Sequence, residues 1–209
     1  MLGQAYVETV KQKIEGALRA TLEVIFNIKT GEIFKPSQLL NDLNPSFNDG
    51  YECWPLAYCA LLRLLPQLNI SRESVFLDIG CGAGRALFMA AAFRPRKVIG
   101  LELDAKAFSM LERNYNHYRF YKKNIKLINV DAAQYEFTDE TIVYMFNPFG
   151  PDTLREVLKN LLLSIERNPR QVTIAYTNAR HSDVILSQSW PKSLHIERPR
   201  HTLLLKSII

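Results

Sequence analysis

The chain has 209 residues, of which 47% are hydrophobic and 22% are charged, and its formal net charge is +5. These values are typical of a globular domain with a sizeable core. No apolar run reaches the ~18 residues of a membrane span, and the first residues lack the pattern of a signal peptide. The cysteines at Cys53, Cys59 and Cys81 show neither metal-ligand nor disulfide spacing, so we expect a cytoplasmic protein with no metal and no membrane partner.

The first segment, residues 4–26, has the pattern of an amphipathic helix. Apolar residues recur at steps of three and four, at Val7, Val10, Ile14, Leu18, Leu22 and Ile25. Residues 27–49 contain turn signals and predict an irregular connection. We therefore expect two parts: residues 1–49, a helix and connecting segment packed on the core, and residues 50–209, one folded domain.

The rest of the chain alternates between strand and helix patterns. We expect strands over residues 75–78, 97–102, 125–130, 141–146, 171–176, 194–198 and 202–206. We expect helices over residues 54–65, 85–93, 105–121, 151–167 and 182–189. This alternation predicts an α/β fold with a doubly wound, mostly parallel seven-stranded sheet, to which a final hairpin adds an antiparallel strand.

A glycine-rich turn follows the first of these strands. Asp78 closes the strand, and a helical pattern opens at Arg85. The glycines between them are Gly80, Gly82 and Gly84. Ligands bind at such a turn in doubly wound folds, because glycine lets the backbone turn tightly and approach the ligand. A dinucleotide fold requires G-x-G-x-x-G, but Arg85 occupies the sixth position here, which disfavours an NAD-dependent oxidoreductase.

The spacing G-x-G-x-G, with an acid two residues before the first glycine, resembles motif I of the class I S-adenosylmethionine (SAM) methyltransferases. The resemblance implies SAM as cofactor and residues 50–209 as the SAM-binding domain. SAM carries an ammonium and a sulfonium group, which favour a nearby carboxylate such as that of Asp78. The alternative is that Asp78 only forms the turn. The loop residues expected at the cofactor are Gly80, Cys81, Gly82 and Gly84.

Two further acids stand at the ends of the next two strands. Glu102 lies 18 positions after Gly84, near the ~20-residue spacing at which an acid reaches ribose hydroxyls in related folds. Its competitor, Asp104, better fits a helix cap. Asp131 and Ala132 resemble the family's adenine contact, in which the carboxylate accepts a hydrogen bond from the exocyclic amine and a backbone N–H serves a ring nitrogen.

The fourth strand ends in Phe146-Asn147-Pro148-Phe149-Gly150, where the family's acceptor is expected. Amino-methylating relatives carry Asn or Asp, then Pro and aromatics there. Carbonyl oxygens of Asn147 and Pro148 can accept N–H bonds from a target amine, and Phe149 can contact the acceptor. The segment departs from the fuller N-P-P-[YF] pattern, since one proline is missing and Gly150 follows the aromatic residue. The alternative is a turn and helix cap before Pro151.

Tyr51 and Glu52 precede the helix expected over residues 54–65. The non-SET protein-lysine methyltransferases carry a Tyr and an acid at this place, so the resemblance implies that both residues help to close the methionine end of SAM. A surface loop with a buried tyrosine is the alternative. The chain also resembles bacterial methyltransferases with G-Y-E-x-x-P and F-N-P-F segments, and this resemblance does not identify a substrate.

The sequence therefore predicts a SAM-dependent methyltransferase that acts on a nitrogen acceptor, most readily a protein side chain. The alternatives are an RNA base N-methyltransferase, which the positive charge slightly favours, and a SAM-binding protein without turnover.

Overall fold

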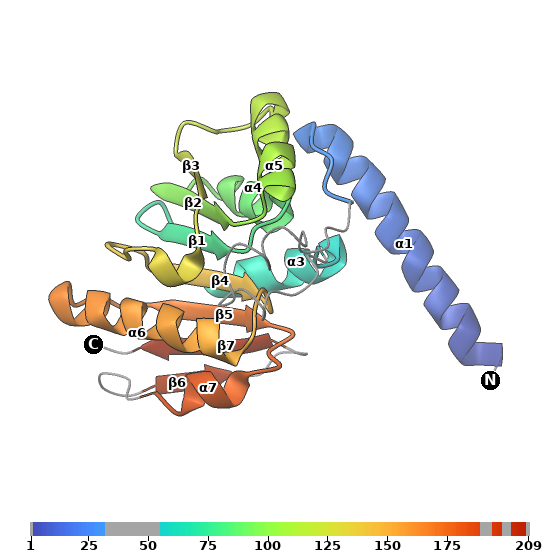
Figure 1. Ribbon diagram of the computed structural model, residues 1–209. Coiled ribbons are helices and arrows are strands. Elements are labelled where there is room, and N and C mark those ends of the chain that lie inside the picture. Colours follow the sequence, from blue (N-terminus) through green and yellow to red (C-terminus); the bar gives the residue numbers. More distant parts are fainter. Residues whose placement is uncertain (1, 32–54, 189–193, 198–201, 208–209) are drawn as a thin grey trace.

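The computed structural model describes residues 2–31, 55–188, 194–197 and 202–207, and within them seven strands form one sheet (Figure 1). The sheet order is β3-β2-β1-β4-β5-β7-β6. The strands are β1 (Val75–Ile79), β2 (Lys97–Glu102), β3 (Ile125–Asn129), β4 (Ile142–Phe146), β5 (Thr173–Thr177), β6 (Leu194–Glu197) and β7 (Thr202–Ser207). The α-helices are α1 (Leu2–Phe26), α3 (Tyr58–Leu64), α4 (Arg85–Ala91), α5 (Ala105–His117), α6 (Pro151–Arg167) and α7 (Ser182–Leu186). Two short 3-10 helices are η2 (Leu65–Leu68) and η3 (Ala132–Gln134).

Strands β1 to β5 run parallel, and β1 pairs with both β2 and β4. The winding direction therefore reverses at β1, which creates a crevice at the carboxyl ends of β1 and β4. Strand β7 pairs antiparallel with β5 and with β6, as expected for a closing hairpin. The predicted doubly wound, mostly parallel α/β sheet is confirmed.

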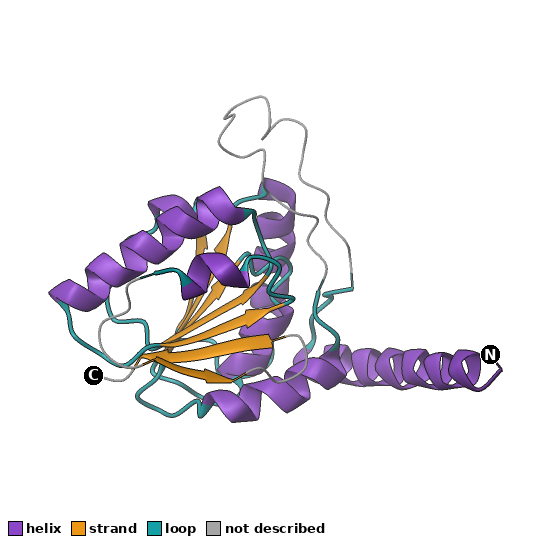
Figure 2. Ribbon diagram, turned by 90° about the horizontal axis from the view of Figure 1, so that it is seen from below, coloured by secondary structure: helices purple, strands orange, loops and turns teal. Residues whose placement is uncertain are grey.

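Helices cover both faces of the sheet (Figure 2). Alternate residues of β1 serve the two faces because successive strand side chains point in opposite directions. Phe76 packs with α3, α4 and α5 in one core cluster, while Leu77 and Ile79 pack with α6 and α7 in the other. All of β1 is buried, so the loop that follows it is anchored in the centre of the molecule.

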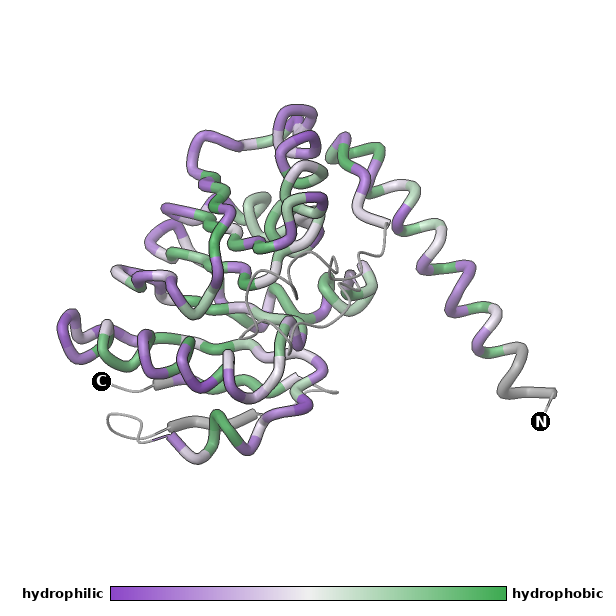
Figure 3. Tube along the Cα trace, viewed as in Figure 1, coloured by the Kyte–Doolittle hydropathy of each residue, from purple (hydrophilic) through white to green (hydrophobic). Residues whose placement is uncertain are grey.

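Helix α1 projects from the body (Figure 1), and its apolar residues alternate with polar ones along its length (Figure 3). Its end is anchored, because Phe26 and the following Ile28 are buried. Its first half is not, since Val7 and Ile14 are 51% and 53% exposed. Leu18 and Leu22 also pack against a core cluster, and the expected packing of the whole segment 1–49 stays a prediction. The boundary expected between residues 49 and 50 lies outside the described residues and stays a prediction.

Several element boundaries differ from the predicted ones. Helix α5 ends at His117 instead of residue 121, because Tyr118 turns inward and its hydroxyl donates to the Phe88 carbonyl at 2.9 Å. Strand β3 ends at Asn129, so Asp131 lies in the loop after it. Of the helix expected over 54–65, residues 58–64 are α-helical. None of the described helices is long and apolar enough to cross a bilayer.

Candidate cofactor and acceptor site

The glycine loop after β1 requires glycine at two positions. Gly80 has φ +69°, and a Cβ there would lie 2.6 Å from the Pro148 Cβ. Gly84 has φ +91°, and its Cβ would lie 2.5 Å from the Phe88 ring. The first glycine therefore permits close contact between this loop and the segment after β4, while the second permits α4 to pack against the loop.

Glu102, the last residue of β2, ties its strand to the glycine loop. One carboxylate oxygen accepts from the Gly82 N–H at 2.7 Å, and the other accepts from the Leu103 and Asp104 N–H groups at 2.9 Å. The side chain is buried, and this burial raises its pKa, although the three backbone donors oppose the shift. A carboxylate has about four acceptor positions, so one remains for a ligand hydroxyl.

Asp78 is buried in β1, and its Oδ2 has no hydrogen-bond partner. Desolvation, and then the neighbouring Glu102 charge, raise the pKa of Asp78 to about 8. A buried acceptor without a donor is costly, and such groups in native proteins cluster at functional sites. This orphaned oxygen fits a cationic ligand such as the ammonium or sulfonium of SAM.

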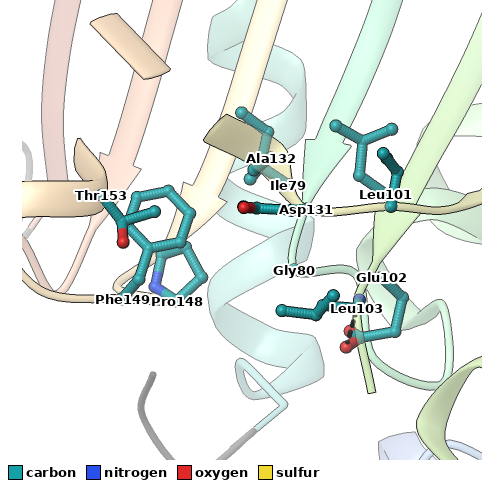
Figure 4. Close-up of a pocket in the computed structure, with 11 residues that line it drawn as sticks. Ile79, Gly80, Leu101, Glu102, Leu103, Asp131, Ala132, Pro148, Phe149 and Thr153 are labelled. Atoms are coloured by element: carbon teal, nitrogen blue, oxygen red, sulfur yellow. Dashed lines mark hydrogen bonds between the residues drawn. The ribbon is translucent and has the colours of Figure 1, made fainter. Parts of the chain in front are cut away.

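A cleft lies where the carboxyl ends of β1, β2 and β3 meet the segment after β4 (Figure 4). Its lining residues are Ile79, Gly80, Leu101, Glu102, Leu103, Val130, Asp131, Ala132, Pro148, Phe149 and Thr153. The cleft encloses about 90 Å³, which is less than the ~300–1,000 Å³ of a complete ligand pocket. We therefore expect it to take one end of SAM, the adenosine.

Asp131 and Ala132 lie together at the start of η3, on the wall of this cleft. The Asp131 Oδ1 accepts from the Ala133 N–H at 2.9 Å, which caps η3. Asp104, as its position suggested, instead caps α5 by accepting from the Lys106 and Ala107 N–H groups. Asp104 is therefore occupied by a helix end, while Asp131 both caps a short helix and faces the cleft.

The residues of the segment after β4 differ in whether they line the cleft. Pro148 and Phe149 line the cleft, but Asn147 does not. Asn147 is buried with φ 42°, and its side-chain oxygen accepts from the Tyr176 hydroxyl at 2.8 Å. The suggestion that Asn147 caps the next helix is wrong, because Gly150 is the N-cap residue of α6 and no side chain bonds there.

Two polar side chains, which the sequence analysis did not single out for this role, attach the segment after α1 to the glycine loop and the start of α4. The buried Arg85 guanidinium donates to the Thr30 hydroxyl and carbonyl and to the Leu56 carbonyl, at 2.9–3.0 Å. Asn114 of α5 donates to the Ala83 and Lys29 carbonyls and accepts from the Lys29 N–H, each at 2.8 Å. These bonds fix the segment after α1 against the loop.

The structure thus brings one group of the predicted residues to the cleft: Gly80, Glu102, Asp131, Ala132, Pro148 and Phe149. A second group does not line the cleft: Asp78 lies in β1, Cys81, Gly82 and Gly84 lie in the loop after it, and Asn147 lies directly after β4. Tyr51 and Glu52 lie outside the described residues. Thr153 is a lining residue that the sequence analysis missed; the available signal was its place in the first turn of the helix that follows the Asn147–Gly150 segment. Among the described residues, no group of His, Cys, Asp and Glu has the arrangement of a metal site.

The sheet order, the glycine loop and the acids at the carboxyl ends of β1, β2 and β3 are features of the class I methyltransferase fold. The family model described as "Methyltransferase domain" matches residues 76–168, from β1 to the end of α6. Residues 76–168 therefore match a methyltransferase domain, and the fold of the chain is similar to that of solved class I SAM-dependent methyltransferases.

Two curated relatives are histone-lysine N-methyltransferases specific for H3 lysine 79. The one from Dictyostelium discoideum is 33% identical over 113 residues, which are 44% of this chain and 6% of that protein. The one from Drosophila melanogaster is 27% identical over 170 residues, which are 75% of this chain and 9% of that protein. The chain therefore matches less than a tenth of the length of either relative.

A similar solved structure is an RNA methyltransferase from Salinibacter ruber in complex with S-adenosyl-L-homocysteine. Its TM-score is 0.52 at 17% identity, over 73% of this chain and 91% of that one. At this identity the likeness concerns the fold. The relatives named here act on a histone lysine or on RNA, so they leave the acceptor of this chain open.

Proposed function

We propose that this chain transfers a methyl group from SAM to a nitrogen acceptor on a protein side chain. The observation that carries the proposal is the contact of Pro148 with Gly80, which places the segment after β4 on the wall of the cleft. When bound, SAM supplies an activated methyl group on a sulfonium. The residues around it then have to bind the cofactor, orient the acceptor and exclude water, since no further activation of the methyl donor is needed.

In this proposal the acids at the strand ends hold the cofactor. Glu102 accepts one ribose hydroxyl through its remaining acceptor position, and Asp131 accepts a hydrogen bond from the adenine amine. Asp78, under the glycine loop, offers its orphaned oxygen to the cationic methionine end. Cys81 and the loop glycines provide the backbone surface, and Tyr51 and Glu52 are proposed to close that end.

The acceptor amine is proposed to meet the segment after β4. The Pro148 carbonyl and the second lone pair of the Asn147 side-chain oxygen accept its N–H bonds, while Phe149 walls the cleft beside it. Tyr176 holds the Asn147 amide in one orientation through its hydroxyl. Oriented in this way, the nitrogen lone pair points at the methyl carbon.

The protein acceptor is favoured by the two histone-lysine methyltransferases among the relatives. An RNA base is the second candidate, which the sequence pI of about 9.1 favours. We also propose a cytoplasmic location, in keeping with cysteines whose positions in the sequence show no disulfide spacing.

The test is to incubate the purified full chain with methyl-labelled SAM and a cell lysate separated into protein, RNA and small-molecule fractions. Label that is recovered in a protein fraction, and located by mass spectrometry on a side-chain nitrogen, supports the proposal. Label in RNA alone selects the second candidate. Binding of SAM with no label transfer to any fraction, and no S-adenosylhomocysteine formed, favours a SAM-binding protein without turnover.

A further inference from the structure

A second cavity lies at the edge of the sheet opposite the cofactor cleft. Its lining residues, Arg72, Arg94, Pro95, Arg96, Tyr121 and Asn124, come from the loops that precede β1, β2 and β3. These three strands are parallel, so their amino ends meet at one edge and bring the loops together. The cavity encloses about 340 Å³ and is open to solvent.

The charge of this edge is strongly positive. Its exposed cations are Arg72, Arg94, Arg96, Arg119 and Lys123, while Glu73 is the acid within the three loops. Arg96 is paired with Asp139, which comes from outside the loops, at 2.9 Å. Within the described residues, the guanidinium groups of Arg72 and Arg94 have no ion pair or hydrogen bond, so they are available to bind an anion. Guanidinium groups bind phosphate oxygens in a bidentate manner.

Aromatic rings alternate with these cations. Phe93, Phe120 and Tyr121 are 41%, 45% and 39% exposed, although large rings are usually buried. The Lys123 ammonium lies 5.1 Å from the centre of the Tyr121 ring. The Asn124 amide donates to the Pro95 carbonyl at 2.6 Å, which fixes the loop before β3 against the loop before β2. The Tyr121 ring thus lies on the cavity wall together with Arg72, Arg94 and Arg96.

We propose that this surface, formed by the loops before β1, β2 and β3, binds single-stranded nucleic acid. Arginines that bind phosphates, next to exposed rings on which bases stack, are the combination by which proteins hold single strands. An acidic peptide would use the cations and leave the rings without a role. The surface lies across the sheet from the cofactor cleft, so it is a docking site distinct from the acceptor site proposed above.

The test is fluorescence anisotropy of the full chain with a labelled mixed-sequence single-stranded RNA of about 20 nucleotides, over a range of salt concentrations. The combined variant Arg72→Ala/Arg94→Ala/Lys123→Ala is expected to bind about tenfold more weakly or worse. The slope of log affinity against log salt should fall in magnitude by about 2, because each lost phosphate contact contributes ~0.7. Tyr121→Ala should weaken binding about fivefold or more with little change in this slope, because stacking releases no counterion.

The matched control, Arg155→Ala/Lys159→Ala/Arg167→Ala, removes the same charge from exposed positions of α6. It should bind the RNA within about twofold of the wild type. Calorimetric titration with SAM shows whether each variant is folded. If the triple variant does not fold, Tyr121→Ala, which changes one exposed ring, still tests the proposal. Failure of the wild type to bind RNA at low salt, equal losses in both triple variants, or equally tight binding of polyglutamate would overturn the proposal.

Discussion

Gly80 and Pro148 meet so closely that a methyl group on Gly80 would lie 2.6 Å from the Pro148 Cβ. This contact joins the loop after β1, where the cofactor is expected, to the segment after β4, where the acceptor is expected. The two halves of the proposed reaction are therefore held together by backbone geometry that an added side chain would disturb.

Gly80→Ala should consequently damage both stability and cofactor binding. The positive φ and the contact with the rigid proline ring should together cost about 2–4 kcal/mol of unfolding free energy. SAM affinity should fall as the loop shifts. Urea unfolding and calorimetric titration measure the two effects. Gly16→Ala is the control, because nothing lies within 4 Å of the added methyl in α1 and alanine favours a helix. Equal behaviour of the two variants would show that the Gly80–Pro148 contact has no structural role.

Asp78→Asn should change how the stability of the cofactor-free protein depends on pH. The pKa of Asp78 is raised to about 8 from an ordinary value of 3.8, so the folded state holds this proton more tightly than the unfolded state. The resulting stability is complete below about pH 4 and is lost as pH rises toward 8. Asparagine does not titrate, so Asp78→Asn should gain stability relative to the wild type as pH increases, visible in thermal melts of the cofactor-free protein.

The same carboxyl should make SAM binding depend on pH. A cationic ligand favours the ionised carboxylate, so wild-type affinity should decrease as pH falls below about 8, whereas Asp78→Asn should bind weakly with a flatter profile. Calorimetry at several pH values provides the measurement. Parallel profiles for the two proteins would exclude Asp78 from contact with the cationic end of SAM.

Asn147→Ala and Tyr176→Phe should show whether Asn147 orients the acceptor or only stabilises the fold. Asn147→Ala should leave SAM affinity nearly intact and slow single-turnover methyl transfer by on the order of 10²-fold. Tyr176→Phe removes the hydroxyl that holds the Asn147 oxygen and keeps the ring, so it should slow transfer by a smaller factor. If both variants lose about 1 kcal/mol of stability and transfer methyl groups at the wild-type rate per folded molecule, Asn147 is structural.

Arg85→Lys should loosen the attachment of the segment after α1 to the glycine loop. Lysine keeps the charge but cannot reproduce the three guanidinium bonds to Thr30 and Leu56. We expect a loss of about 2–3 kcal/mol in urea unfolding, because buried carbonyl and hydroxyl groups lose a charged partner. The matched control is Arg94→Lys, at an exposed position, which should be neutral. An equally small effect at both positions would contradict the role of Arg85 as a clamp.

Local patterns predicted much of this molecule and missed what depends on distant partners. Strand β2 and helix α6 have the predicted bounds, because hydrophobic spacing and Pro151 mark them directly. The glycine spacing and the acids after successive strands located the cleft. The end of α5 was misplaced, since the Tyr118 hydroxyl bonds to Phe88, which is 30 positions away. The Tyr176–Asn147 bond and the bond from Arg85 to Thr30 were also not predicted, because each joins residues far apart in the sequence. From the sequence alone, Arg85 has the character of an exposed charged residue, and only the fold shows that it is buried.

Calorimetric titration of SAM into the wild type, Asp78→Ala and Glu102→Ala tests the assignment of the cofactor site most directly. Each substitution should cost about 1.5–3 kcal/mol of binding free energy, a ~10- to 150-fold weaker dissociation constant. Glu166→Ala, which removes an exposed carboxylate from α6, should bind SAM as the wild type does. Unchanged SAM affinity in both Asp78→Ala and Glu102→Ala would contradict the account of how this chain holds its cofactor.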